Sequence, residues 1–297
     1  MIVDSFLPRE FAAAMRADID AHFSAPYQHH PDTHQVWNYW FVPQTYTYLR
    51  TQPEKVIQRA NIERFMGQLR AWSSETLGLA RLSWPYLSLY ISGCRQGLHN
   101  DVRNGRFGFV YSLTRDERRS TGGETIVLRP GDPFRRNLRR ASAGTALYEL
   151  VEPRFNRLVV FDDRMVHGVQ LVEGSMDPAE GRFVLHGHIE ESGPIVTGPL
   201  PPERVLQGLR SVLEPFDKEY ADQARHYDGP LVLRFTITPE GRVSRLRVIL
   251  DRVFTQREGD VGWSAISSRL VEHLRAVVFP ASAGETSVTL PLRFGGR

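Results

Sequence analysis

The chain has 297 residues and a net charge of +3, with 24% charged and 41% hydrophobic residues, which is ordinary for a soluble globular protein. Cys94 is the single cysteine, so an internal disulfide is excluded and a reducing compartment is favoured. The N-terminus lacks a basic, apolar leader, and no segment approaches about 18 consecutive apolar residues. We therefore expect a cytoplasmic protein with no membrane partner.

Arginine supplies almost all of the positive charge, since only Lys55 and Lys218 among 37 basic residues are lysines. The densest cluster lies in a stretch bounded by Gly and Pro and consists of Arg135, Arg136, Arg139 and Arg140. A solvated loop is one interpretation, and contact with an anionic substrate or a nucleic acid is the other. No aromatic pattern is interleaved with these arginines, so we do not expect a nucleic-acid partner.

The first part of the chain predicts two helices. Pro8 can occupy a first turn, and apolar residues follow at four-residue spacing, which predicts a helix over residues 8–23. Residues 25–50 are rich in His, Tyr, Trp and Pro without a clear period and are typical of loop and short strand. An apolar face recurs over residues 53–77 and predicts a second helix.

From residue 82 to residue 189 the pattern changes to short strands separated by Gly, Pro and Asp turns. The predicted strands are residues 86–90, 107–113, 124–128, 157–161, 166–172 and 182–189. Many short strands of this kind indicate a barrel or a sandwich.

A Pro- and Gly-rich stretch at residues 192–201 has the composition of a linker. It separates a predicted first domain, residues 1–191, from a second, residues 202–297. In the second domain we expect a helix, a β-hairpin around the turn at 238–241, another helix and a final strand. This α-β-β-α-β order predicts a three-stranded sheet with helices on one face.

The motif His-x-Asp occurs at residues 30–32, 99–101 and 226–228, and a motif this short carries little weight alone. Residues two apart on a strand share a face, so the pair can present both side chains to one ion where the backbone is extended. Only the pair at 99–101 lies near predicted strands and has a histidine, His167, and an arginine, Arg182, further along them. Two histidines and a carboxylate form the facial triad of non-haem Fe(II) sites.

Each of these residues also has a structural interpretation. His167 could be a hydrogen-bonded structural histidine, Arg182 a salt-bridged arginine, and Asp101 a cap of the turn at residues 104–105. Because His99, Asp101, His167 and Arg182 occur in this order and on these strands, we favour a metal site.

At these residues the chain resembles the 2-oxoglutarate- and Fe(II)-dependent dioxygenases, in their prolyl-hydroxylase-like branch, over residues 1–190. The matching motifs are Val3-Asp4-Ser5-Phe6-Leu7-Pro8, Tyr90-x-x-Gly93, Asn104-Gly105-Arg106, Gly122-Gly123-Glu124-Thr125 and Val160-Phe161 before His167. The resemblance implies a mainly β fold with flanking helices, a double-stranded β-helix or jelly roll. It also implies that His99, Asp101 and His167 bind iron.

The same resemblance implies how the cosubstrate is held. Arg182 would pair with the distal carboxylate of 2-oxoglutarate, and Tyr90 would donate a hydrogen bond to it from a neighbouring strand. A guanidinium suits this task because its planar fork binds a carboxylate through two hydrogen bonds. Fe(II), 2-oxoglutarate and O2 would be needed, with ascorbate as an optional reductant. The products would be succinate, CO2 and a hydroxylated amino-acid or peptidyl substrate.

Residues 202–297 resemble the C-terminal domain of TonB-like proteins, so the whole chain is expected to be α+β. The matching motifs are Gly229-Pro230-Leu231-Val232-Leu233-Arg234-Phe235, Pro239-Glu240-Gly241-Arg242-Val243, Val277-Val278-Phe279-Pro280-Ala281 and Val288-Thr289-Leu290-Pro291-Leu292-Arg293-Phe294. Coupling to a membrane energy source is not expected, because a transmembrane helix and a long Pro-rich spacer are missing. This domain is either a packing or homodimerising appendage or a recruiter of substrate by strand addition.

Three functions remain open from the sequence: an oxygenase, a non-catalytic sensor that binds metal and 2-oxoglutarate, and an adaptor working through its TonB-like domain. The acceptor of an oxygenase is not fixed by its fold. An aromatic and histidine-rich stretch either walls the pocket or packs in the core, and it contains His29, His30, His34, Trp37, Tyr39, Trp40 and Tyr46.

Overall fold

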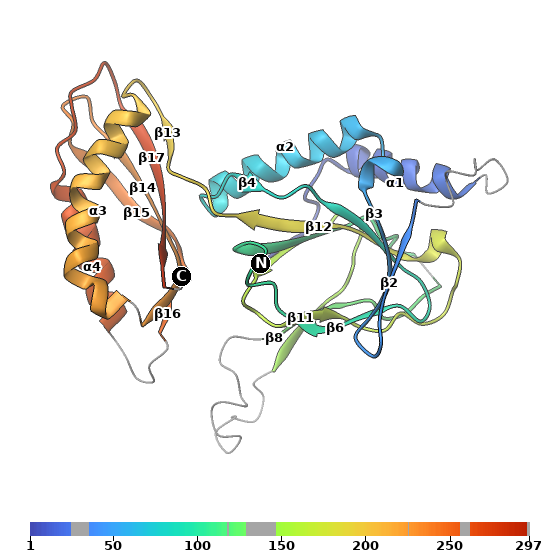
Figure 1. Cartoon of the computed structure of the whole chain (residues 1–297). Helices are drawn as coiled ribbons and strands as arrows, with labels where there is room; N and C mark the ends of the chain where they lie inside the picture. Colours follow the sequence, from blue (N-terminus) through green and yellow to red (C-terminus); the bar gives the residue numbers. More distant parts are fainter. Residues whose placement is uncertain (25–35, 118, 129–146, 225, 256–261, 296–297) are drawn as a thin grey trace. The chain divides into compact units, whose positions relative to one another are not determined.

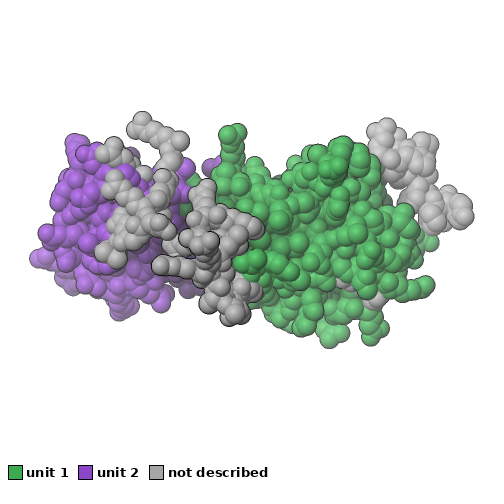
Figure 2. Space-filling view, turned by 90° about the horizontal axis from the view of Figure 1, so that it is seen from below, with its two compact units in different colours: residues 1–69, 82–190 green, residues 70–81, 191–297 purple. Residues whose placement is uncertain are grey.

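A computed structural model of the chain describes residues 1–24, 36–117, 119–128, 147–224, 226–255 and 262–295 (Figure 1). They form two compact units, Met1–Leu69 with Leu82–Glu190, and Arg70–Arg81 with Glu191–Arg297 (Figure 2). The arginine cluster at 135–140 and the His-x-Asp motif at 30–32 lie outside the described residues. Within the described ranges, no helix has the length and apolar character needed to cross a membrane.

The predicted first helix is confirmed as α1 (Arg9–Ser24), but the predicted helix over residues 53–77 is two elements. A 3-10 turn, η3 (Pro53–Lys55), precedes helix α2 (Arg59–Thr76). Val56 lies between them with φ −126° and ψ −40°, outside the helical region, and interrupts the helix. Asp18 of α1 accepts a hydrogen bond from the backbone N–H of the residue before α2, which favours a new helix start there.

The first unit is built on a twelve-stranded sheet whose paired strands are antiparallel. Its strands are β1 (Ile2–Val3), β2 (Asn38–Val42), β3 (Tyr46–Thr51), β4 (Arg81–Leu82), β5 (Tyr86–Tyr90), β6 (Arg95–His99), β7 (Phe107–Ser112), β8 (Thr125–Leu128), β9 (Tyr148–Val151), β10 (Leu158–Asp162), β11 (His167–Val169) and β12 (Arg182–Glu190).

The strand order is β1-β10-β7-β12-β5-β3-β6-β11-β8-β9, with β2 paired to β3 and β4 to β12. The sheet curls, so that β12 lies on one side of the unit and β6, β8 and β11 on the other (Figure 1). Helices α1 and α2 cover the β12 side, where Phe65 of α2 packs on Tyr111 of β7 with ring centroids 5.0 Å apart. A mainly β, curled antiparallel sheet with few helices agrees with the predicted jelly-roll core.

The six predicted strands are all present, the one over 166–172 only as the short β11, but β1, β4, β6 and β9 were not predicted. Strand β6 reads Arg-Gln-Gly-Leu-His, without alternation or β-branched residues, so its composition carries no strand signal. It is held between β3 and β11 by cross-strand pairing. Tertiary pairing therefore decides its conformation.

The second unit contains helices α3 (Pro202–Ala224) and α4 (Gly262–Ala276), which pack on one face of a sheet (Figure 1). The sheet has five strands rather than the predicted three: β13 (Ile195–Thr197), β14 (Tyr227–Ile237), β15 (Val243–Asp251), β16 (Phe254–Thr255) and β17 (Thr286–Phe294).

The two additional strands of this sheet were missed for separate reasons. Strand β13 lies inside the predicted linker and pairs with β17, while β16 is only two residues long. The predicted turn at 238–241 requires its glycine, because Gly241 has φ +81° and a Cβ there would meet the Phe279 carbonyl oxygen.

Candidate functional site

Two histidines face each other across neighbouring strands of the first unit. His99 ends β6, His167 begins β11, and the antiparallel register places them directly opposite. Opposed residues in a sheet have Cβ atoms about 5 Å apart, so their side chains can touch. The ring centroids of the two histidines are 4.3 Å apart. A Cβ on Gly168 would lie 2.7 Å from the Gln96 carbonyl oxygen, so a glycine is needed for β6 and β11 to approach here.

Both imidazoles are oriented by backbone carbonyl groups. Nδ1 of His99 lies 2.8 Å from the Gly97 oxygen, and Nδ1 of His167 lies 3.0 Å from the Met165 oxygen. A carbonyl oxygen only accepts, so each Nδ1 carries the donated proton and each Nε2 of a neutral ring keeps a lone pair. Burial lowers the pKa of His99, which favours that neutral form. This arrangement orients ligating histidines in metal sites.

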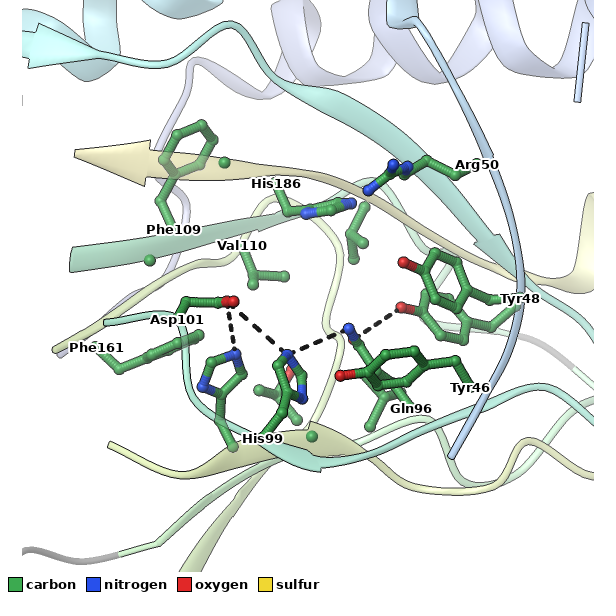
Figure 3. A pocket seen from close by; sticks show the side chains of 18 of the residues that line it. Tyr46, Tyr48, Arg50, Gln96, His99, Asp101, Phe109, Val110, Phe161 and His186 are labelled. Atoms are coloured by element: carbon green, nitrogen blue, oxygen red, sulfur yellow. Dashed lines mark hydrogen bonds and ion pairs between the residues drawn. The ribbon is translucent and has the colours of Figure 1, made fainter. Parts of the chain in front are cut away.

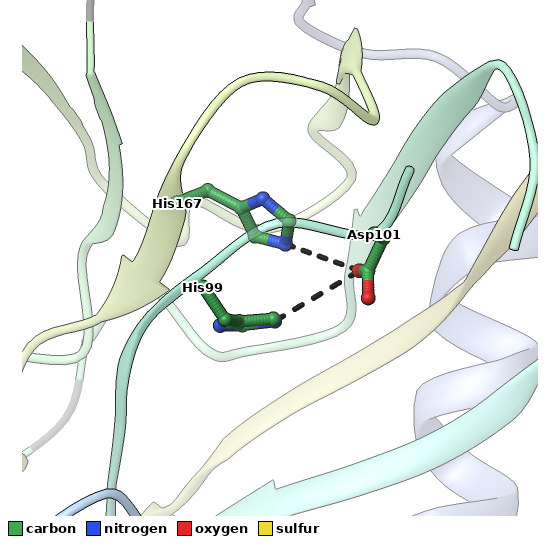
Figure 4. A group of neighbouring side chains, drawn as sticks. All are labelled: His99, Asp101 and His167. Atoms are coloured by element: carbon green, nitrogen blue, oxygen red, sulfur yellow. Dashed lines mark ion pairs between the residues drawn. The ribbon is translucent and has the colours of Figure 1, made fainter. Parts of the chain in front are cut away.

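Asp101 completes the set from the turn after β6 (Figure 4). Its Oδ1 accepts a hydrogen bond from Asn104, and its Oδ2 lies 3.3 Å from Nε2 of His167 and 3.8 Å from Nε2 of His99. Burial acts to raise the pKa of Asp101, but the neighbouring histidines, His167 first, outweigh it when they are protonated at Nε2, and the pKa is lowered. The carboxylate is therefore the stable form.

The donor atoms of His99, Asp101 and His167 all lie within 4.8 Å of one another. Two neutral imidazoles and one carboxylate are the donors of the facial triad that binds non-haem Fe(II) and leaves coordination positions open. The residues therefore fit a divalent transition metal.

A second group, Asp101, Asp163 and His188, also has donor atoms close together. Here Nδ1 of His188 lies 3.1 Å from Oδ2 of Asp163, so two of the three side chains already pair with each other. The Asp163 carbonyl oxygen accepts a hydrogen bond from the Asp101 backbone N–H at 2.9 Å. This second group supports the position of Asp101.

Comparison with known proteins gives structural neighbours only, since no family model and no curated protein matches the chain. The structure is similar to a Trichoplax adhaerens prolyl hydroxylase in complex with a hypoxia inducible factor peptide fragment, at 13% identity and TM-score 0.45 over 63% of this chain and 80% of that one. It is also similar to a Pseudomonas putida prolyl-4-hydroxylase, at 19% identity and TM-score 0.44 over 63% and 89%. A third neighbour is a Burkholderia pseudomallei oxidoreductase of the 2OG-Fe(II) oxygenase family, at 14% identity and TM-score 0.37 over 62% and 93%. Because these sequence identities and TM-scores are low, the proposed function depends on the geometry of the site.

Arg182 and Tyr90 lie directly opposite each other on β12 and β5. Arg182 is 1% exposed, its Nη2 donates to Oγ1 of Thr125 at 3.1 Å, and its Cζ lies 4.8 Å from the Tyr90 ring centroid. Burial raises the pKa of Tyr90, although the Arg182 charge acts in the opposite direction. Tyr90 is therefore a neutral hydroxyl, which donates to Oε1 of Gln96 at 3.2 Å.

The five residues singled out in the sequence line one cavity of about 210 Å³, together with aromatic side chains (Figure 3). Those five are Tyr90, His99, Asp101, His167 and Arg182. The ring of Tyr46 lies 5.4 Å from that of His99, and Tyr48 stacks on Tyr90 at 5.1 Å. The cavity thus combines a metal-ligand set, a buried cation and an aromatic wall.

Some residues of the aromatic and histidine-rich stretch before the second helix line the cavity, and others do not. Trp40 and Tyr46 line the cavity. Trp37 instead packs against Phe183 and donates to His22, and Tyr39 is 61% exposed. The three histidines of the stretch, His29, His30 and His34, lie outside the described residues.

Sequence analysis missed several polar residues of the cavity. Gln96 lies between the Tyr90 hydroxyl and Nε2 of His99, and Thr125 holds Arg182. Arg50, His186 and His188 are others. These three had a sequence signal, since Arg50 alternates with Tyr46 and Tyr48 along one strand, and His186 and His188 alternate with Arg182 along another. The hydrogen bonds Tyr90–Gln96 and Arg182–Thr125 join different strands, which no local pattern shows.

Proposed function

We propose that the first unit is a 2-oxoglutarate- and Fe(II)-dependent oxygenase that hydroxylates a C–H bond of an amino-acid or peptidyl substrate. The observation that carries this proposal is the approach of the His99, Asp101 and His167 donor atoms to within 4.8 Å, with both Nδ1 atoms held by carbonyl groups. Fe(II) and 2-oxoglutarate would supply the oxidising chemistry, with O2 consumed and succinate and CO2 released.

The protein's part is to bind and orient. His99, Asp101 and His167 would hold the metal. Arg182, steadied by Thr125, would bind the distal carboxylate of 2-oxoglutarate through charge-assisted hydrogen bonds, which gain strength from its burial. The Tyr90 hydroxyl would donate to the same carboxylate in exchange for its present acceptor, Gln96.

The cavity wall would keep water from the reacting groups. Phe161 packs on His167 with ring centroids 4.4 Å apart, and Tyr46 packs on the other histidine. These rings cover the two imidazoles with apolar surface, which strengthens electrostatic interactions inside the site and limits side reactions.

The test is succinate formation from 2-oxoglutarate by the full chain, with and without Fe(II) and with candidate acceptors. We expect turnover that requires Fe(II), rises with a true acceptor and disappears in His99→Ala and Asp101→Ala. His273→Ala, in α4 of the second unit, is the matched control and should retain it. Turnover that persists in both triad variants would contradict the proposal. Binding of 2-oxoglutarate without turnover by any acceptor would favour the sensor.

For the second unit we propose a TonB-like module that recruits a peptide segment of the substrate by strand addition. Strand β15 is at the edge of its sheet, and its Val248 is 50% exposed. In the full chain, Val248→Lys should raise the KM for a peptide acceptor and leave kcat unchanged. An unchanged KM would favour a packing or homodimerising appendage, and light scattering would then report the oligomeric state. If a partner protein binds the His99→Ala variant as well as the wild type, the adaptor function would be favoured.

A further inference from the structure

Arg50 faces the same cavity as the metal-ligand set but lies further along the wall (Figure 3). It shares one face of β3 with Tyr46 and Tyr48, and Tyr46 is the residue that packs on His99. A strand rises about 3.3 Å per residue, so the backbone of Arg50 begins roughly 13 Å from that of Tyr46. Arg50 therefore reaches the cavity from a point away from the metal ligands.

Two aromatic rings hold the Arg50 guanidinium in place. Its Cζ lies 3.7 Å from the Trp40 ring centroid and 4.1 Å from that of Tyr86. Stacking uses the faces of the guanidinium and leaves its N–H groups, which point outward in the plane, available to a ligand. The side chain is half-buried, so a bound anion would be partly shielded from water.

The cavity groups nearest to Arg50 are neutral. Burial raises the pKa of Tyr48 and keeps its hydroxyl neutral, although the Arg50 charge acts in the opposite direction. Burial and then the Arg50 charge lower the pKa of His186 to about 3, so its imidazole is uncharged. Across the described parts of the chain, no carboxylate forms an ion pair with Arg50.

A second cavity lies on the other side of Arg50. Trp40 and Arg50 line both cavities, and the second is also lined by Lys55, Gln52 and Tyr86. Among the described residues, its lining includes two cations and no carboxylate. The positive charge thus continues from the metal cavity toward the surface of the first unit.

The charges of the site leave Arg50 without a counter-ion, if the proposed function holds. A divalent metal with Asp101, the single carboxylate among the described residues that line the first cavity, carries one positive charge. Arg182 adds a second, and 2-oxoglutarate as a dianion cancels both. Arg50 is then the remaining charge, and the molecule left to neutralise it is the acceptor.

We propose that Arg50 binds a carboxylate of the acceptor, with Lys55 reinforcing it from the adjoining cavity. The acceptor is therefore a carboxylic acid whose reacting C–H bond lies at the metal while its carboxylate lies at the N–H edge of the Arg50 guanidinium, which Trp40 and Tyr86 hold. This inference rests on the proposed function. The carboxylate belongs either to a free amino acid or to the end or a side chain of a peptide.

The first test uses propionate and its neutral match, propionamide, as probes of the full chain saturated with Zn(II) and 2-oxoglutarate. Arginine Nε–H signals in nitrogen-15 NMR report binding. We expect propionate, but not propionamide, to shift the Arg50 signal, and Arg50→Met to weaken propionate binding at least about 10-fold. Arg59→Met, which changes a surface arginine of α2, is the control.

Binding of 2-oxoglutarate separates this inference from the proposed function. Arg50→Met should leave it unchanged, because Arg182 is the expected anchor of the cosubstrate. Loss of 2-oxoglutarate binding in Arg50→Met would overturn the inference, as would equal affinity for propionate and propionamide. If the wild-type chain binds propionate at Arg50 but not metal or 2-oxoglutarate, the proposed function fails while the anion site stands.

The source of the carboxylate is tested by succinate formation with paired acceptors. Proteinogenic amino acids as free acids and as carboxamides form one arm, and N-acetylated peptides ending in a free carboxylate or an amide form the other. We expect stimulation by the acid member of a pair and its loss in Arg50→Met. Equal stimulation by acid and amide members in both arms would overturn the inference.

Discussion

The two units bury different kinds of side chain. The first buries six ionisable side chains, of which the last two line its cavity: Arg16, Arg157, Asp162, Asp163, His167 and Arg182. In the described part of the second unit, the buried polar residues are the hydroxyl-bearing Ser73, Thr286 and Thr289. Burying a charge costs free energy unless it is paired or bound. Under the proposed function, His167 and Arg182 serve the chemistry of the first unit, whereas the described core of the second unit serves its stability.

The largest expected effect is on metal binding by the first unit. His167→Ala removes one of three metal ligands. Mutation of residues that only support ligands already lowers metal affinity by about 10–100-fold, so this variant should lose more than about 100-fold in metal affinity. Mn(II) titration followed by electron paramagnetic resonance would measure it. His273→Ala should match the wild type, and the second unit of His167→Ala should unfold at the wild-type urea concentration. Unchanged Mn(II) affinity would contradict the metal site.

The next effect concerns the second unit alone. Leu270 of α4 is fully buried, so Leu270→Ala should lower the free energy of unfolding of this unit by about 2–5 kcal/mol through lost burial and a cavity. Urea unfolding followed by circular dichroism would measure the change. Mn(II) affinity should stay the same, because the metal ligands lie in the other unit. A parallel loss of Mn(II) binding would refute the division of roles.

A smaller effect tests the role of Arg182, the buried cation of the cavity. Arg182→Met keeps much of the side-chain volume but removes charge-assisted hydrogen bonds, each contributing about 1.5–3 kcal/mol, so 2-oxoglutarate affinity should fall about 10–100-fold. Calorimetry on the Mn(II)-loaded chain would measure it. Tyr90→Phe should lower affinity less, because it removes one neutral hydroxyl. If Tyr90→Phe has the larger effect, the assignment of Arg182 is wrong.

The smallest effect concerns a contact inside the second unit. Arg234 of β14 forms an ion pair with Glu75 at 2.8 Å and donates to the Ser74 carbonyl oxygen at 2.8 Å, so it links β14 to the end of α2 that belongs to this unit. Glu75 is mostly exposed, and Arg234→Met should therefore destabilise this unit by about 1 kcal/mol or less. Urea unfolding measures the change, with Arg269→Met of α4 as control. A loss above about 2 kcal/mol would mean that Arg234 is a principal tether.

The sequence located the candidate site because its residues follow strand periodicity. His99 with Asp101, His167 and Arg182 stand at or near the ends of predicted strands, and the structure brings them together with Tyr90 in one cavity. The oxygenase roles of these residues remain predictions. His167 and Arg182 lie beside strands with a clear apolar signal, whereas His99 and Asp101 flank β6, which has none, and were found by their His-x-Asp spacing.

What could not be predicted depends on contacts between distant segments. Strand β6 has no strand composition and forms through its neighbours, so the cross-strand pairing of the two histidines was invisible in the sequence. Gln96 lies on the same strand, and its contacts with Tyr90 and His99 were equally invisible. The assignment of residues 70–81 to the second unit depends on contacts of the Arg234 type.

The most direct test of the central claim is anaerobic calorimetry of 2-oxoglutarate binding to the full chain, with and without Mn(II). We predict one 2-oxoglutarate bound per chain, only when metal is present, with binding lost in Asp101→Ala and weakened in Arg182→Met. Binding that does not depend on metal, or no binding to the metal-loaded wild-type chain, would contradict the assignment of this cavity as a 2-oxoglutarate and metal site.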